Sequence, residues 1–361
     1  MSKFQTHPVL ESDLPEVARF LPDWWGQGTP ESDRANPEEI LRHLVWRLVK
    51  NPARQSDTEV GQCIRDTDGR VVGTILYFPE WFLLGDRRLR GLCASSFFVE
   101  PPVRMLAFFV FRRFLRIPGF DFWFGTSNNT DGGRVWDKLG GAAVRESAVE
   151  YILPVHLGRV MEAVSEGRSW SRIVTPLFTL LGTLATPFLA PRPKGCLPTV
   201  EVCRDWERLA YLATQHRDPE VLTCERSVEF LRWRYGESPS PFPKVVYRFD
   251  DGKGNEGWFS IGRALRGCQK QVRTVTILDV VWPKRAVTVA DIISTVVECS
   301  GSDIDMIVGS YRRFFGDGWR SLGFRQRKYG GPRTYIVSDC PPSTELAEAA
   351  DFVPGDGDTA D

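Results

Sequence analysis

One pattern occurs twice in this sequence, once in each half. Each copy has a valine that ends an apolar segment, a glycine that ends a second apolar segment, and a Leu-Gly pair that follows a helical segment. These landmarks are Val99, Gly125 and Gly140 in the first copy and Val281, Gly309 and Gly323 in the second. The distance along the chain between equivalent landmarks is nearly constant, an agreement that is hard to obtain by chance. The repeat predicts two copies of a strand–helix–strand–helix unit, and therefore two domains.

The composition limits the classes of protein and partner. A length of 361 residues is sufficient for two domains with sizeable cores, and 42% hydrophobic and 25% charged residues are typical of a soluble globular protein. Lys and Arg together number 46, as do Asp and Glu, so there is no excess positive charge that would favour nucleic acid. The eight cysteines have no CxxC spacing, and the start at Met1 lacks an apolar leader. We therefore expect free thiols, no metal site, no nucleic-acid partner and a cytoplasmic location.

The expected domain boundaries follow from the repeat and from shifts in composition. We predict an N-terminal domain over residues 1–158, an apolar, proline-rich linker over 159–198, a C-terminal domain over 199–340 and an acidic, disordered tail over 341–361. Both domains are predicted to have an α/β (α+β) fold, in which helices flank a mixed, mostly antiparallel sheet.

Two segments are predicted to close the two sheets. Residues 143–153 follow the last helix of the first copy, and residues 334–337 follow the last helix of the second. Both have the apolar, β-branched and aromatic content of strands. We expect each of them to pair within its own domain.

The linker contains a long uncharged stretch. Residues 173–191 have no charge, but Pro176 and Pro187 argue against one continuous helix. A spanning helix needs about 20 apolar residues, and a single span would leave the two similar domains on opposite sides of a membrane. We expect residues 173–190 to pack on protein, with shallow peripheral contact to a membrane surface as the alternative.

The first copy of the repeat resembles the GNAT N-acetyltransferase superfamily. The resemblance rests on a hairpin, a strand ending Val99-Glu100-Pro101, a helix, and the segments Gly125-Thr126-Ser127-Asn128 and 134–140. It extends over residues 75–140 of the first domain and over a shorter stretch of the second. The chain therefore looks like a tandem GNAT protein of bacterial type. This implies N-acyl transfer from acetyl-CoA or another acyl-CoA to a small-molecule amine or sugar, such as an amino sugar or a cell-envelope precursor.

The resemblance also implies where the cofactor binds. A helix that begins after Val-x-Pro offers unpaired N–H groups and a positive dipole end to the pyrophosphate of CoA. The backbone of the preceding strand end would pair with the pantetheine arm, and an Asn after the next strand would reach the same arm. The residues at these positions are Phe98, Val99, Arg104, Met105, Leu106, Ala107 and Asn128. Asn128 could equally cap the helix that follows it.

Both phosphate loops differ from the family pattern, which has small residues where the phosphates approach. In the first domain Ala107 replaces the first glycine and Phe109 stands where a small residue belongs. In the second domain Arg285 is present but Thr288 replaces the glycine. We expect binding in the first domain, which alone keeps both the Arg and the Asn. The differences make a catalytically inactive GNAT-fold protein that binds a ligand or partner the alternative function.

Acyl transfer also needs a base to accept the proton of the attacking amine. The candidate carboxylates are Glu80, Glu100 and Asp279. Asp279 lies in an apolar strand, where a carboxylate without a partner is costly, so it is either a functional group or a buried hydrogen-bond acceptor. The family often has a tyrosine as the acid in the helix before Leu-Gly, but this chain has Trp136, for which we expect a packing role.

Overall fold

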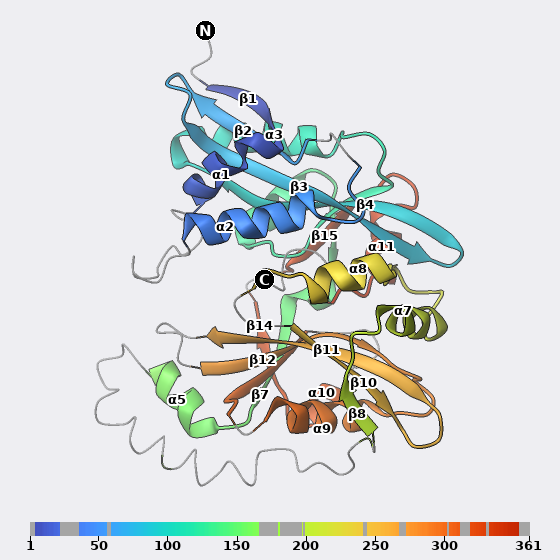
Figure 1. Ribbon diagram of the computed structural model, residues 1–361. Helices are drawn as coiled ribbons and strands as arrows, with labels where there is room; N and C mark the ends of the chain where they lie inside the picture. Colours follow the sequence, from blue (N-terminus) through green and yellow to red (C-terminus); the bar gives the residue numbers. More distant parts are fainter. Residues whose placement is uncertain are drawn as a thin grey trace.

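A computed structural model describes most of the chain (Figure 1). The described residues are 4–21, 36–55, 59–165, 180, 197, 199–240, 244–266, 272–301, 303–310, 318–329 and 332–353. Within them no helix is both long and apolar enough to cross a membrane. The predicted contact through residues 173–190 lies outside the described residues, apart from Leu180.

The elements of the two halves follow the chain in the same order. Those of the first half are β1 (Phe4–Val9), η1 (Glu11–Asp13), α1 (Leu14–Phe20), α2 (Pro37–Leu44), η4 (Val45–Val49), β2 (Gly61–Asp66), β3 (Val71–Leu84), β4 (Arg87–Val99), η5 (Pro101–Val103), α3 (Arg104–Phe114), β5 (Phe122–Gly125), α4 (Thr130–Lys138), β6 (Ala142–Val144), η6 (Arg145–Ala148), β7 (Val149–Pro154) and α5 (Leu157–Ser165). Those that follow are β8 (Thr199–Val202), α7 (Trp206–Gln215), β9 (Thr223–Cys224), α8 (Val228–Leu231), η7 (Arg232–Gly236), β10 (Lys244–Asp250), β11 (Glu256–Arg266), β12 (Val272–Val281), α9 (Val289–Ser300), β13 (Met306–Ser310), α10 (Gly318–Ser321), β14 (Arg325–Lys328), β15 (Thr334–Val337) and α11 (Ser343–Ala349).

The two sheets have equivalent strand orders. The first runs β1-β2-β3-β4-β5-β15-β6, with β9 attached to β3, and the second, read from its other edge, runs β8-β10-β11-β12-β13-β7-β14. Val99 and Val281 end the equivalent strands β4 and β12, and Gly125 and Gly309 lie in the equivalent strands β5 and β13. In both sheets these strands are parallel neighbours, and most other pairs are antiparallel. The predicted fold class and duplication are therefore confirmed.

The predicted closing strands are exchanged between the halves, which corrects the expectation from the sequence. Strand β15 pairs with β5 and β6 of the first sheet, with Tyr335 opposite Gly125. Strand β7 pairs with β13 and β14 of the second sheet, with Tyr151 opposite Gly309. The strand pattern of residues 149–154 and 334–337 is satisfied in either sheet, because periodicity fixes which face is buried and not which neighbour is chosen. The exchange locks the halves together as domain swapping locks two chains.

The predicted disordered tail is partly folded, which is a second correction. Helix α11 packs against β6 and β15, and its Leu346 is fully buried. Beyond it, Phe352 stacks on Phe124 with ring centroids 5.3 Å apart, and Val353 is buried. Acidic composition suggested disorder, but these apolar side chains bury enough surface to order the segment up to residue 353.

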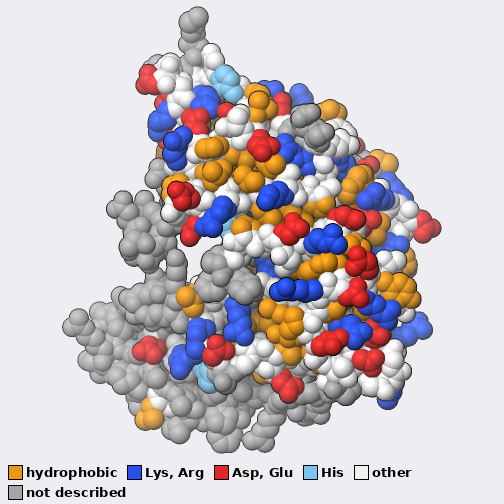
Figure 2. Space-filling view, viewed as in Figure 1, with side chains coloured by type: hydrophobic (Ala, Val, Ile, Leu, Met, Phe, Trp, Pro, Cys, Tyr) orange, Lys and Arg blue, Asp and Glu red, His pale blue; other side chains and the backbone are white. Residues whose placement is uncertain are grey.

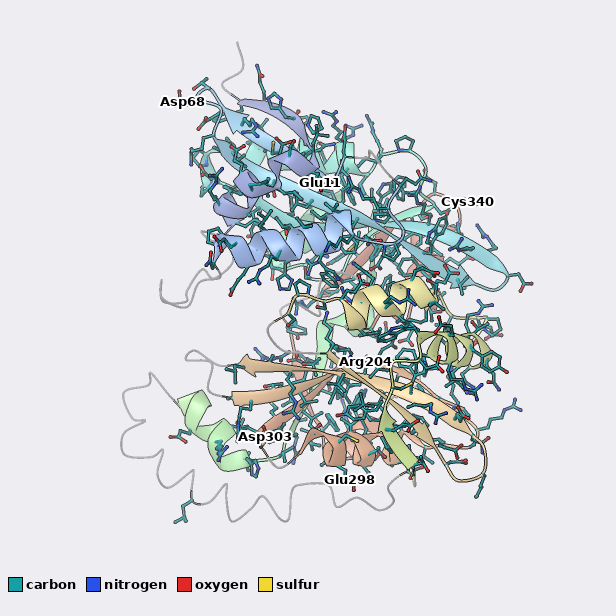
Figure 3. The ribbon with its side chains drawn as sticks, viewed as in Figure 1. Glu11, Asp68, Arg204, Glu298, Asp303 and Cys340 are labelled. Atoms are coloured by element: carbon teal, nitrogen blue, oxygen red, sulfur yellow. The ribbon has the colours of Figure 1, made fainter. Side chains whose placement is uncertain are left out.

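The helices form three layers, one between the two sheets and one on the outer face of each sheet. The central layer contains α1, α2, α7 and α8, whose apolar residues join the inner faces of both sheets in one shared core. Figure 1 shows α2 and α8 facing each other between the sheets. The outer face of the first sheet is covered by α3 and α4, and that of the second by α9 and α10. Glu298 of α9 and Asp303 accordingly lie on the outer side of the second half (Figure 3).

Candidate active site in the first half

Strands β4 and β5 diverge in the first sheet. Their parallel pairing is confined to Gly91–Cys93 and Phe122–Phe124, whereas β4 continues to Val99 on the edge of β3. A β-bulge lies where they part, since Leu76 is opposite Ser95 but Thr74 is opposite Phe98. Ser96 inside the bulge has a positive φ of 48°. Bulges bend a strand and increase its twist, so this one turns the last residues of β4 away from β5.

The second sheet repeats this divergence. Pairing between β12 and β13 is confined to Thr274–Thr276 and Met306–Val308, while β12 continues to Val281. A register shift between Ser260 and Ile261 places a bulge at the equivalent point of β12. Strand geometry alone therefore gives each half a gap between its two central parallel strands.

The helix that begins beside the first gap has an open N-terminus. The N-cap of α3 is Val103, whose side chain makes no capping hydrogen bond, and no acidic residue lies in the first turn. Arg104 is exposed at the first helical position. The 3-10 turn η5 leads directly into α3, and the N–H groups of Val103 and Arg104 donate to the carbonyl oxygens of Glu100 and Pro101. What this end offers an anion is therefore the N–H groups of the next residues, the positive end of the helix dipole and the exposed Arg104 guanidinium.

The equivalent helix of the second half has a closed N-terminus. The Thr288 hydroxyl accepts from the N–H of Asp291 at 3.2 Å, and the Asp291 carboxylate accepts from the N–H of Thr288 at 3.0 Å. This capping box uses the donors that an anion would need and adds a negative charge in the first turn. The two gaps therefore have similar strand geometry, but the helix beside the second gap has a side-chain cap and an acidic residue that disfavour phosphate, and α3 has neither.

Asn128 is a structural part of the first gap. Its amide nitrogen donates to the carbonyl oxygens of Gly125 at 3.0 Å and Arg333 at 2.8 Å. Its amide oxygen accepts from the indole of Trp136 at 2.8 Å. Both amide donors are thus used in holding β5, α4 and the segment before β15 together. The alternative that Asn128 caps α4 is wrong, because the cap is Asn129, which accepts from the N–H of Gly132 at 2.8 Å.

Glu100 and Glu80 have different surroundings. Both oxygens of Glu100 accept from Arg70, at 2.8 and 3.1 Å, in a bidentate ion pair at the end of the β2–β3 hairpin. This pairing occupies both carboxylate oxygens of Glu100. Glu80 is 1% exposed on β3, opposite Gly91, on the strand face that also carries Phe78 and Phe82 toward the second half.

Asp279 is a buried acceptor in the second half. It receives hydrogen bonds from the Arg226 guanidinium, from the Tyr235 hydroxyl at 3.3 Å and from the N–H of Val280 at 2.8 Å. Burial and the Asp279 charge raise the pKa of Tyr235. Asp279 thus belongs to a strand of the second sheet, whereas Glu80 lies on β3 of the first sheet and Glu100 follows its strand β4.

A cavity lies beside Asp279. Its volume is about 400 Å³, and it opens between α7, the segment 223–229 and the end of β12. A smaller cavity of about 110 Å³ lies where the exchanged strands cross, lined by Glu150, Arg266 and Asp351 among others. Glu150 accepts from Arg266 at 2.8 Å there. Burial and Glu150 together raise the pKa of the neighbouring Tyr329.

The sequence contains a second repeated signal at the joint between the halves. Leu44-Val45-Trp46-Arg47 and Leu231-Arg232-Trp233-Arg234 share the spacing Leu-x-Trp-Arg. Both segments form single π turns, and both arginines are buried, at 4% and 0% exposure. Comparing the two halves outside the GNAT-like unit would have identified this pair.

Comparison with known proteins gives a fold. Neither protein-family profiles nor curated protein sequences match this chain. Among solved structures, Saccharomyces cerevisiae N-myristoyltransferase with bound myristoyl-CoA aligns over 93% of this chain and 83% of its own, with 13% identity and a TM-score of 0.58. A GCN5-related N-acetyltransferase from Anabaena variabilis aligns over 92% and 72%, with 12% identity and a TM-score of 0.52. The fold is the tandem GNAT fold.

A third neighbour agrees with this result. A protein of unknown function from Enterococcus faecalis, described as a probable N-acyltransferase, aligns over 96% of this chain and 74% of its own, with 10% identity and a TM-score of 0.54.

Proposed function

We propose that this protein transfers an acyl group from acyl-CoA to an amine, and that the acyl-CoA is bound by the first half. The observation that carries the proposal is the contrast between the two helix N-termini. The α3 terminus has no side-chain cap and begins with Arg104, whereas the α9 terminus is capped by Thr288 and Asp291. Of these two helices, only α3 has a first turn that contains no acidic residue and no side-chain cap to compete with a pyrophosphate.

The donor would lie along the diverging end of β4. The backbone of Phe98 and Val99 would pair with the pantetheine arm, on the edge of β4 that β5 has left. The N–H groups of Met105, Leu106 and Ala107 and the guanidinium of Arg104 would hold the pyrophosphate. Asn128 would act by keeping the wall of the gap in place, because its amide donors are already bonded.

The chemistry requires the removal of one proton. The amine nitrogen attacks the thioester carbonyl carbon, the carbon–sulfur bond breaks, and the CoA thiolate takes up a proton as the new amide loses one. Of the three candidate carboxylates we propose Glu80 as the proton acceptor, because Glu100 is bound by Arg70 and Asp279 lies in the other half. The acceptor class is a small amine, such as an amino sugar.

A second function is favoured by one specific observation. Trp136 occupies the place where the family often has an acidic tyrosine, and it is fully buried with its N–H bonded to Asn128. A protein that binds acyl-CoA or another ligand without transferring the acyl group would need no such acid.

Two measurements separate these functions. A thermal-shift titration with acetyl-CoA and with a long-chain acyl-CoA should raise the melting temperature, because a ligand that binds only the native state stabilises it. Release of free CoA thiol in the presence of amino sugars would then show transfer. Stabilisation without thiol release would support the binding protein. No stabilisation by any acyl-CoA would contradict the transfer proposal and would leave only a protein that binds another ligand.

A further inference from the structure

We propose that the exposed face of α3 docks the protein on an anionic lipid bilayer. We call this surface the α3 face and define it by Met105, Phe109, Arg112, Arg113 and Arg116. The proposal does not depend on the transfer chemistry, and it places membrane contact on a folded helix, outside the apolar linker.

Two large apolar side chains stand in solvent on this face. Met105 is 82% exposed and Phe109 is 62% exposed, which makes them the two most exposed large hydrophobic residues in the described part of the chain. They are four positions apart and therefore neighbours on the helix surface. A soluble helix that only covered its own sheet would have polar residues at both positions.

Arginines surround these apolar side chains. Arg112, Arg113 and Arg116 are exposed, and residues 101–120 contain no aspartate or glutamate. At about 100° per residue, Met105, Phe109 and Arg112 fall within roughly 60° of one another on the helix. The opposite side, with Val110, Phe111 and Phe114, is buried against the first sheet.

The charge on the α3 face is local. The chain as a whole has equal numbers of basic and acidic residues, and on the face in Figure 2 blue and red side chains are interspersed. Within the described residues, the arginines of the α3 face form no ion pair with a carboxylate. The segment 101–120, which has arginines and no acid, is therefore complementary to a negative surface.

The combination selects a bilayer as the occupant. Apolar side chains that enter the acyl region, beside arginines that reach lipid phosphates, are the features of a helix that lies in a membrane interface. A nucleic acid would use the arginines but would leave Met105 and Phe109 in water. Docking through this face would also bring the open N-terminus of α3, and with it the proposed donor site, close to the membrane.

The test is co-sedimentation of the full chain with lipid vesicles. Vesicles that contain phosphatidylglycerol should pellet the protein and vesicles of phosphatidylcholine alone should not, and the binding should weaken as salt rises. Met105→Ser/Phe109→Ser and Arg112→Glu/Arg116→Glu should each reduce the partition coefficient at least tenfold. Val202→Ser, which changes a side chain that is 60% exposed on the second half, is the matched control and should bind as the native protein does.

Three results would overturn the proposal. They are equal binding to both kinds of vesicle, unchanged binding of either double variant, and loss of binding only when residues 173–190 are replaced by a polar linker. If the protein bound a DNA duplex in preference to vesicles, the α3 face would be a nucleic-acid-binding surface and the bilayer proposal would be wrong. Both double variants change solvent-exposed positions, and an unchanged melting temperature would show that they fold.

Discussion

Trp46 and Trp233 donate their indole N–H groups to each other's main-chain carbonyl oxygens, at 3.0 and 2.9 Å, and their rings stack with centroids 4.9 Å apart. Each lies in a π turn of one half, so the contact is symmetric. Both rings are buried, at 3% and 2% exposure, in the core that the halves share. This pair and the exchanged strands join the two domains through one shared core.

Replacement of either tryptophan should destabilise the whole molecule. Trp46→Ala and Trp233→Ala should each reduce the free energy of unfolding by about 3–5 kcal/mol, because a large cavity forms in the shared core. Trp46→Phe keeps most of the apolar volume and should cost less, although it leaves the carbonyl oxygen of Trp233 without its donor. Urea unfolding followed by fluorescence measures the difference, and a loss confined to one half would contradict a shared core.

The exchanged strands predict that neither half folds alone. A fragment of residues 1–165 lacks β15, and a fragment of residues 199–353 lacks β7, so each sheet would miss the strand between its two neighbours. We expect the separate fragments to be disordered or aggregated, and coexpressed fragments to form a soluble complex. Circular dichroism and copurification test this, and an independently folded fragment would contradict the strand assignment.

Two equivalent glycines should differ in their tolerance of alanine. A Cβ atom on Gly309 would lie 2.3 Å from the ring of Trp319, whereas one on Gly125 would lie 3.0 Å from the ring of Trp136. Overpacking a core usually costs about 1–3 kcal/mol. Gly309→Ala should therefore lower the melting temperature clearly more than Gly125→Ala, and the reverse order would contradict the tighter packing around Gly309.

Burial of one thiol should give a pH-dependent signal. Burial raises the pKa of Cys63 above its usual value of 9.0, so the folded state keeps the thiol protonated when the unfolded chain has begun to ionise. The resulting contribution to stability is complete below about pH 9 and is lost as the pH rises through the folded pKa. With Cys63→Ala, the free energy of unfolding should fall less steeply as the pH rises from the pKa of the thiol in the unfolded chain to its higher pKa in the folded protein.

The same thiol should resist alkylation in the folded protein. Cys340 is exposed at the edge of the first half (Figure 3) and should react first, while Cys63 should react only on unfolding. Mass spectrometry after iodoacetamide treatment identifies the modified residues. Rapid labelling of Cys63 under native conditions would contradict its buried environment.

Much of the fold could be predicted from local sequence. The matching patterns around Val99 and Val281 predicted two equivalent strands, and the strand order of both sheets agrees with them. The exchange of β7 and β15 could not be predicted, because it depends on how the two sheets face each other. The order of the tail depends on Leu346 and Phe352, whose apolar contacts outweigh the acidic composition around them.

The features of the candidate site that depend on the local backbone could be predicted from the sequence. The features that depend on hydrogen-bond partners far away along the chain could not. The divergence at Val99 and the helix that begins at Arg104 follow from the local pattern. The bonds that occupy Asn128 and Asp279 come from Arg333, which is 205 residues away, and from Arg226, which is 53 residues away. No local pattern identifies such partners, so the structural role of both residues became apparent only in three dimensions.

The most direct test of the proposed donor site is isothermal titration calorimetry with acyl-CoA on one pair of variants. Arg104→Glu places a carboxylate at the open terminus of α3 and should abolish binding. Arg285→Glu makes the same change at the equivalent position of the second half and should leave the affinity unchanged. The reverse pattern would move the donor site to the second half, and no binding by the native protein would contradict the proposal that the first half holds acyl-CoA.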